Sequence, residues 1–241
     1  MTFWDGVLTL LYILVFPLIS YFSARNKPQQ FSREESEERI NAYRTTIFSQ
    51  FILGTALIVL WIFQDRSWES LGLGLYLGIG FWISAGVAAA ILLYFYRQVR
   101  QVSSGNADVI RKNRDEMGNM LNLMPHSQHE LHYFYGVSLT AGVIEELLFR
   151  GYFIWFFVQL MPVWGAAIFG ILIFGLAHCY QGVKHLPMIL LYGAILMGLF
   201  ILSGSLWVPI ALHFFGDVLQ GQLAYQIVVQ SGLALTENEV E

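Results

Sequence analysis

Charged residues are scarce in this chain, and cysteine is almost absent. Only 12% of the 241 residues are Asp, Glu, Lys or Arg, whereas soluble domains carry about 25%. The single cysteine, Cys179, excludes an internal disulfide and leaves the redox compartment open. Since 56% of the residues are hydrophobic, the composition excludes an ordinary soluble domain and indicates a protein that crosses a membrane several times.

The chain contains several long apolar segments. They run for about 20 residues without the alternating period of a β-barrel strand, so we expect an all-α, polytopic helical membrane protein with about seven transmembrane helices. The first segment lacks the basic region of a signal peptide, and we expect it to be retained. The fourth is either one long tilted helix or a span that ends near Gly151 followed by a separate piece, which would make eight helices. The expected segments are 3–22, 46–63, 71–96, 132–160, 163–180, 186–203 and 206–229.

Basic residues are concentrated in two segments, 25–44 and 97–130. Lys184 falls on the same side of the membrane as these segments, whereas the opposite side would carry only Arg66. Loops rich in Lys and Arg stay in the cytoplasm. We therefore expect the N-terminus outside, the C-terminus in the cytoplasm and, in a bacterium, insertion in the plasma (inner) membrane.

Three short polar motifs interrupt the apolar segments of the C-terminal half. Each places ionisable groups where a charged side chain costs about 2.5–3.5 kcal/mol at mid-membrane. Several such groups together indicate an intramembrane active site. The motifs are Glu145-Glu146-Leu-Leu-Phe-Arg150, Phe174-Gly-Leu-Ala-His178 and His213-Phe-Phe-Gly-Asp217.

The first motif separates into a pair and a lone carboxylate. Residues four apart lie on one face of a helix, so Glu146 and Arg150 are placed to form an ion pair. Glu145 points about 100° away from Glu146 and has no such partner. A carboxylate of this kind beside a trapped water is a candidate general base. The alternative is that all three residues form a structural charge cluster.

The other two motifs add histidines. Phe174 and His178 share a helix face, so the ring can pack beside the imidazole, and His213 and Asp217 can interact directly. A single histidine in a membrane helix is often only a hydrogen-bonded packing residue. Two histidines and an unpaired glutamate on separate spans can supply a base for water and donors for an oxyanion, as hydrolysis requires.

In their order and spacing, the three motifs resemble those of the CAAX proteases and bacteriocin-processing enzymes, intramembrane endopeptidases related to the Ras-converting enzyme of eukaryotes. The resemblance covers about residues 132–217. It implies a protease core of four C-terminal helices over 131–230. Transmembrane helices with two cytoplasmic basic loops would precede this core over 1–130, and a polar cytoplasmic tail would follow it over 231–241.

The resemblance also implies a role for each matching residue. Glu145 and His178 would activate a water molecule for attack on a peptide bond. His213 and Asp217 would stabilise the oxyanion. The helix and the base would be supported by three further residues: Glu146, Arg150 and Phe174.

Asp217 departs from the family pattern, in which asparagine is the commoner residue at this position. The amide of asparagine can donate a hydrogen bond, whereas aspartate donates only when it is protonated. Asp217 could therefore orient His213 or bind an ion instead of contacting the oxyanion.

A metal-dependent mechanism is the alternative for the same residues. His178, His213 and Glu145 could hold a catalytic zinc ion with one open position. The chain has no His-Glu-x-x-His helix that would hold such ligands. The resemblance favours a glutamate-dependent mechanism in which no cofactor is required.

We therefore expect an intramembrane endopeptidase whose partners are the lipid bilayer and a peptide or membrane-protein substrate. The net charge of −4 gives no sign of nucleic-acid binding. Neither the identity of the substrate nor the oligomeric state follows from the sequence. The alternative is a non-catalytic membrane protein with the same fold that binds a peptide in immunity or signalling, and an ion or proton transporter is the third hypothesis.

Overall fold

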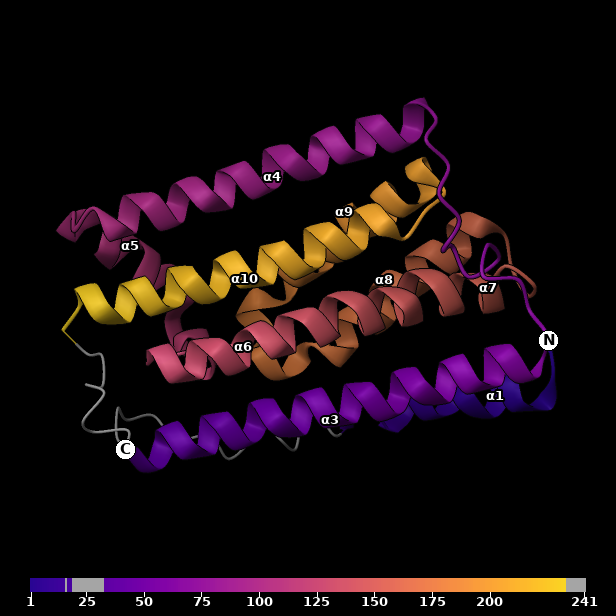
Figure 1. Ribbon diagram of the computed structural model, residues 1–241, viewed down its shortest axis with the longest axis horizontal. Helices are drawn as coiled ribbons and strands as arrows, with labels where there is room; N and C mark the ends of the chain where they lie inside the picture. Colours follow the sequence, from indigo (N-terminus) through magenta and orange to yellow (C-terminus); the bar gives the residue numbers. More distant parts are fainter. Residues whose placement is uncertain (16, 19–32, 233–241) are drawn as a thin grey trace.

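The computed structural model describes residues 1–15, 17–18 and 33–232, and every regular element in these ranges is a helix (Figure 1). This confirms the expected all-α class. The long helices lie side by side in one bundle, in which consecutive long helices run in opposite directions. The α-helices are α1 (Phe3–Leu10), α3 (Arg33–Phe63), α4 (Ile79–Ser103), α5 (Ala107–Met117), α6 (Gln128–Thr140), α7 (Phe153–Phe157), α8 (Val163–Ala177), α9 (Leu186–Ser203) and α10 (Trp207–Gln230).

The third apolar segment becomes helical later than its hydropathy suggests. We expected a span over 71–96, but α4 begins at Ile79, and residues 71–78 form turns and irregular chain. This stretch holds three glycines, which disfavour helix, and Gly72 has a positive φ of 87°. The carbonyl of Gly72 accepts instead a 2.8 Å hydrogen bond from the backbone N–H of Leu206, just before α10.

The second basic segment is also not the loop that we expected over 97–130. α4 continues to Ser103, and α5 follows after a turn at Gly105, which has a φ of 79°. The side chain of Asn106 caps α5 by accepting hydrogen bonds from the backbone N–H groups of Asp108 and Val109. A sequence scan for hydropathy misses such a helix because its surface is polar.

The fourth apolar segment is one continuous helical run from Gln128 to Phe157. α6 passes into two π-helical segments, Ala141–Glu145 and Leu147–Tyr152, which lead into α7. The joining residue Glu146 keeps right-handed helical angles, with φ −68° and ψ −42°. Of the two alternatives, the single long helix is therefore correct here. π-Helical turns are rare and frequently occur at functional sites, and the first polar motif extends across these two segments and the residue between them.

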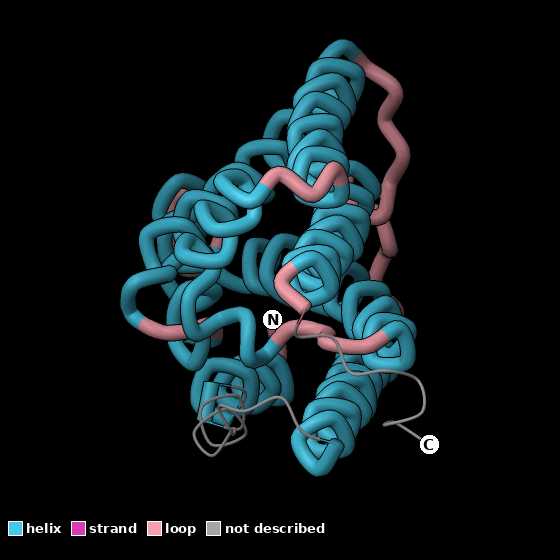
Figure 2. The backbone as a smooth tube through the Cα atoms, turned by 90° about the vertical axis from the view of Figure 1, so that its left-hand side faces the viewer, coloured by secondary structure: helices cyan, strands magenta, loops and turns pink. Residues whose placement is uncertain are grey.

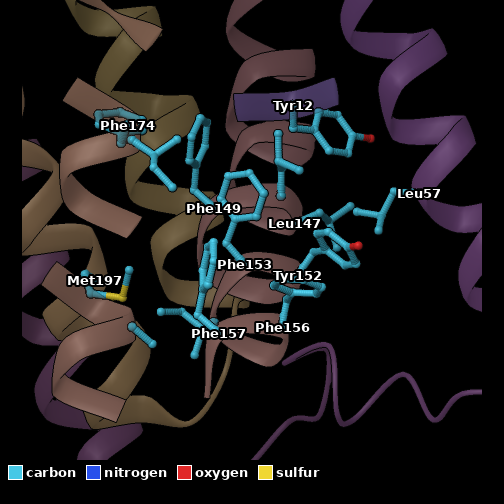
Figure 3. Close-up of a cluster of buried hydrophobic side chains, with 14 of the residues drawn as sticks. Tyr12, Leu57, Leu147, Phe149, Tyr152, Phe153, Phe156, Phe157, Phe174 and Met197 are labelled. Atoms are coloured by element: carbon cyan, nitrogen blue, oxygen red, sulfur yellow. The ribbon is translucent and has the colours of Figure 1, made fainter. Parts of the chain in front are cut away.

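A cluster of buried aromatic and aliphatic side chains surrounds the second π-helical segment and α7 (Figure 3). Phe149 and Phe153 meet edge to face, with ring centroids 5.6 Å apart. Leu57 closes the cluster on the side of α3, whereas Phe174 and Met197 close it on the side of α8 and α9. This packing holds the run with the first motif in the middle of the bundle.

The two ends of the bundle differ in charge. α5, the start of α3 and the end of α10 lie at one end, from which Figure 2 views the molecule, and the N-terminus and α7 lie at the other (Figure 1). Of the described Lys and Arg residues away from the motifs, only Arg66 lies at the N-terminal end. Arg25 and Lys27 of the first basic segment lie outside the described residues, as does 233–241 of the expected tail. The cations at the first end lie on α3, α4 and α5: Arg39, Arg44, Arg97, Arg100, Arg111, Lys112 and Arg114. Lys184 lies between α8 and α9.

A buried ion pair fixes α3 against the start of α6 near the basic end. Arg39 Nε lies 2.8 Å from Glu130 Oε2, and the Arg39 Nη2 donates to Glu130 Oε1 at 3.1 Å. The hydroxyl of Ser36 donates to the same carboxylate. Because both charged side chains are almost fully buried, this contact sets the position of α3 along α6.

Three helical segments within the described residues are long and apolar enough to cross a membrane, judged by length and composition. Large apolar side chains on these segments are exposed; Phe51, for example, is 65% exposed and Trp82 is 61% exposed. Apolar surface of this extent fits lipid better than water. The three segments are Ser36–Phe63, Ile79–Ser103 and Val183–Ser203, and Phe3–Leu14 and Val163–Ala177 are shorter apolar helices.

Candidate active site

The three polar motifs meet in the interior of the bundle. The first lies in the π-helical run after α6, the second at the end of α8 and the third in the first half of α10. α10 packs against the segment Ala141–Glu145, and α8 packs against the segment Leu147–Tyr152. Glu146, Arg150 and His213 are each less than 5% exposed. The charged groups of the site are therefore shielded from solvent and contact one another.

A glycine contact brings α10 close to the first motif. A Cβ atom at Gly142 would lie 2.8 Å from the backbone nitrogen of Phe214 and 2.9 Å from its Cα. Only glycine leaves room for this approach of the two backbones. His213, the neighbour of Phe214, is thereby within reach of Glu146 across the helix interface.

The two oxygens of Glu145 have different surroundings. Oε1 accepts a 2.9 Å hydrogen bond from the Gln50 side-chain amide of α3. Oε2 accepts from no donor among the described residues and lies 3.5 Å from Nε2 of His178. Glu145 is thus held through one oxygen while the other faces the imidazole.

His178 follows directly after the last residue of α8. Its Nδ1 lies 2.8 Å from the carbonyl oxygen of Phe174, one turn earlier. A carbonyl only accepts, so Nδ1 must carry the proton, and Nε2 of the neutral ring is then an acceptor. The Phe174 ring packs beside the imidazole, with centroids 4.2 Å apart. Phe174 therefore fixes the position and the tautomer of His178.

Glu146 joins Arg150 and His213 through a single oxygen. Its Oε1 accepts from Arg150 Nη1 at 2.7 Å and from His213 Nδ1 at 2.7 Å. The four-residue spacing predicts the first bond, whereas the second crosses from the π-helical run to α10. Arg150 also donates to the carbonyl of Gly193 at 3.2 Å, and its guanidinium lies 4.4 Å from the Phe174 ring centroid. Glu146 thus ties the first motif to the third, across the interface with α10.

His213 and Asp217 approach each other without a hydrogen bond. His213 Nε2 lies 3.7 Å from Asp217 Oδ2, beyond hydrogen-bond distance. The orientation of His213 comes from Glu146 instead, through Nδ1. The side chain of Asp217 is 31% exposed, more than that of His178 or Glu145. Asp217 therefore lies at the open edge of the cluster.

Sequence reasoning missed Gln50. This residue is 2% exposed and lies outside the region of the motifs, on α3. A signal was present, because Gln50 is the most strongly polar side chain in the apolar segment 46–63. A buried amide in such a segment requires a hydrogen-bonding partner.

The described residues do not form a metal-binding cluster. No group of three His, Cys, Asp or Glu residues in the described ranges is placed to hold a metal ion. Nδ1 of His213 is bonded to Glu146, and Nδ1 of His178 is bonded to a backbone carbonyl, so each ring has only Nε2 left for another contact. In the described arrangement, His178, His213 and Glu145 are not grouped as the ligands of one ion.

Comparison with known proteins supports the resemblance drawn from the motifs. The model of the family described as "Type II CAAX prenyl endopeptidase Rce1-like" matches residues 127–219. This range holds all three motifs and excludes α1, α3 and α4. No curated protein and no solved structure matches the chain significantly. Over residues 127–219, the chain is similar to the Rce1-like family of type II CAAX prenyl endopeptidases.

Proposed function

We propose that this protein is an integral membrane endopeptidase that hydrolyses a peptide bond of a membrane-associated or small peptide substrate. One observation carries the proposal: Glu145 Oε2 and His178 Nε2 face each other 3.5 Å apart. Both atoms are proton acceptors when Glu145 is ionised and His178 is neutral. A water molecule is the simplest donor that can serve two such atoms, and hydrolysis requires a water beside a base.

The chemistry follows from this placement. Glu145 takes a proton from water as the water oxygen bonds to the scissile carbonyl carbon, and the carbonyl π electrons move to its oxygen. Collapse of the tetrahedral intermediate restores the C=O bond and breaks the C–N bond. The proton passes to the leaving nitrogen from Glu145, directly or through His178. The products are a carboxylic acid and an amine, and no cofactor is consumed.

His213 is the proposed oxyanion donor. Because Nδ1 donates to Glu146, His213 can donate from Nε2 only as the doubly protonated imidazolium. The carboxylates of Glu146 at 2.7 Å and Asp217 at 3.7 Å favour that positive charge. Because Asp217 lies beyond hydrogen-bond distance of Nε2, the Nε2–H group would stay free to donate to the oxyanion.

The proposed topology places the basic end of the bundle in the cytoplasm. The end with α5 carries most of the described cations, and the N-terminal end carries Arg66. By the positive-inside rule, the N-terminus would lie outside and the end of α10 in the cytoplasm. The protein would then be a multi-pass protein with about seven spans, in the plasma membrane if bacterial.

The test compares the wild type with Glu145→Gln in cells that hold equal amounts of protein. New peptide termini in the membrane fraction and the medium are identified by mass spectrometry. In parallel, both purified proteins are placed in liposomes with an internally quenched, farnesylated CAAX peptide as the probe. Glutamine keeps the oxygen that accepts from Gln50 but cannot act as a base.

We expect termini that the wild type produces and Glu145→Gln does not, because loss of a general base costs roughly 10²- to 10⁴-fold in rate. Identical sets of termini in the two cell lines would overturn the proposal and favour a non-catalytic binding protein. Cleavage of the farnesylated probe by the wild type alone would assign the prenylated substrate class as well.

A further inference from the structure

The amide of Gln50 makes a defined set of contacts from outside the family match. Its Nε2 donates to Glu145 Oε1 at 2.9 Å, and its Oε1 accepts from the Thr140 hydroxyl at 2.5 Å. An ionised carboxylate only accepts, so the amide must present its NH₂ group to Glu145. This leaves the amide oxygen for Thr140. The two contacts agree with a single orientation of the Gln50 amide.

α3 lies close to the helical run of the first motif on both sides of Gln50. One turn earlier, a Cβ atom at Gly136 would lie 3.0 Å from Cδ1 of Ile47. One turn later, a Cβ atom at Gly54 would overlap the side chain of Ile144, next to Glu145. Ile47, Gln50 and Gly54 share one face of α3 because they are three and four residues apart. The hydrogen bond from Gln50 to Glu145 is therefore supported by close packing of α3 against the helical run on both sides of Gln50.

We propose that Gln50 is a positioning residue of the active site. A carboxylate can rotate about its last side-chain bond, and a single donor at one oxygen fixes that rotation. By holding Oε1, Gln50 leaves Oε2 directed at His178 Nε2. The family match covers only residues 127–219, so α3 would complete the site from the N-terminal part of the chain. This inference rests on the proposed function and extends it.

Three variants test this role with the farnesylated peptide in liposomes. Gln50→Leu removes the amide at similar size, and Gln50→Glu keeps the shape but adds a second carboxyl group. Gln222→Leu is the matched control, because Gln222 of α10 also makes a bond between helices, to the Tyr135 hydroxyl at 3.1 Å, away from the motifs. Thermal unfolding in detergent, followed by Trp fluorescence, shows that each variant is folded.

We expect Gln50→Leu to lower kcat by roughly 10- to 100-fold with little change in KM, since small misplacements of reacting groups cost rate by such factors. The activity of Gln50→Glu relative to the wild type should rise as the pH falls. The added carboxyl group donates to Glu145 only when protonated and repels it when ionised. Gln222→Leu should keep the wild-type kcat. A merely structural Gln50 would not produce the pH-dependent ratio.

The possible failures can be told apart. Wild-type kcat in folded Gln50→Leu, with Glu145→Gln inactive, would overturn the role of Gln50 alone. Equal loss of kcat in Gln222→Leu would do the same, because any broken contact between helices would then suffice. Equal cleavage by the wild type and Glu145→Gln would overturn the proposed function and this inference together. If Gln50→Leu does not fold, the pH dependence of Gln50→Glu decides, and a ratio independent of pH counts against the proposal.

Discussion

His178 Nε2 and Glu145 Oε2 face each other at 3.5 Å, with Nδ1 of the imidazole bonded to the carbonyl of Phe174. The two groups come from different helices and cannot bond to each other while the ring is neutral and the carboxylate ionised. In the proposed function, both atoms accept hydrogen bonds from the same water molecule. The consequences of this relationship, and of the contacts around it, can be tested residue by residue.

Replacing His178 with alanine should lower kcat by roughly 10²- to 10⁴-fold, the usual contribution of a proton-transfer group. The fold should persist, because the only protein hydrogen bond described for this imidazole goes to its own helix. Cleavage of the farnesylated peptide measures the effect. His132→Ala is a matched control, since exposed His132 also bonds a carbonyl four residues back. Equal loss in both variants would contradict the role of His178.

Replacing Glu146 with leucine should destabilise the protein by about 3–5 kcal/mol, because Arg150 would be left buried without its carboxylate. The double variant Glu146→Leu/Arg150→Met should regain much of this stability, since no unpaired charge remains. It should not regain activity, because His213 loses the partner of its Nδ1. Thermal unfolding in detergent and peptide cleavage measure the two effects. An active double variant would show that the orientation of His213 does not depend on Glu146.

Asp217→Asn should keep or raise activity at neutral pH, because the Glu146 carboxylate at 2.7 Å still stabilises the protonated His213. The amide places a permanent donor beside His213, where the aspartate can donate only when protonated. Asp217→Ala should lower kcat, because no polar group would remain at that edge. Cleavage rates from acid to neutral pH provide the measurement. Strong loss in Asp217→Asn would mean that the negative charge of Asp217 is required to keep His213 protonated.

Gly142→Ala should cost about 1–3 kcal/mol of stability, as overpacking of a filled interface does. The added methyl group meets the backbone of Phe214, which cannot move away as a side-chain tip can. Activity should fall as well, because α10 carries His213. Gly198→Ala on α9 is the control, since a Cβ atom there has nothing within 4 Å. Similar unfolding temperatures for the two variants would contradict the close helix contact.

Treatment with EDTA or 1,10-phenanthroline should leave peptide cleavage unchanged. The described His, Cys, Asp and Glu residues form no group of three that could hold a metal ion, whereas catalytic zinc sites use three protein ligands. Loss of activity that added zinc restores would show that the site rearranges around a metal in the active enzyme.

Helical spacing predicts the contacts within each motif. Glu146 meets Arg150, and Phe174 packs on His178, because four residues make about one turn. The all-α class also follows from the apolar segments alone. The beginning of α4 at Ile79 does not, since hydropathy ignores the glycines before it.

Contacts between helices escape such reasoning. The bond of His213 to Glu146 depends on how closely α10 approaches at Gly142, and the bond of Gln50 to Glu145 depends on the packing of α3. Neither residue spacing nor hydropathy predicts how closely α10 and α3 approach the helical run of the first motif. The site is therefore larger than its motifs, and its extra members come from tertiary packing.

The π-helical geometry of residues 141–152 has a consequence for insertions and deletions. A π turn contains more residues than an α turn, so the run could lose one residue and still close as a regular helix. Such a deletion would leave the helix beyond it in nearly the same orientation, because one turn closes in either case, but would change the direction of the side chains within the turn. A shortened chain could therefore insert and pack while its two carboxylates pointed away from the histidines. Chain length in this run is thus a separate requirement for activity, beyond the identity of any side chain.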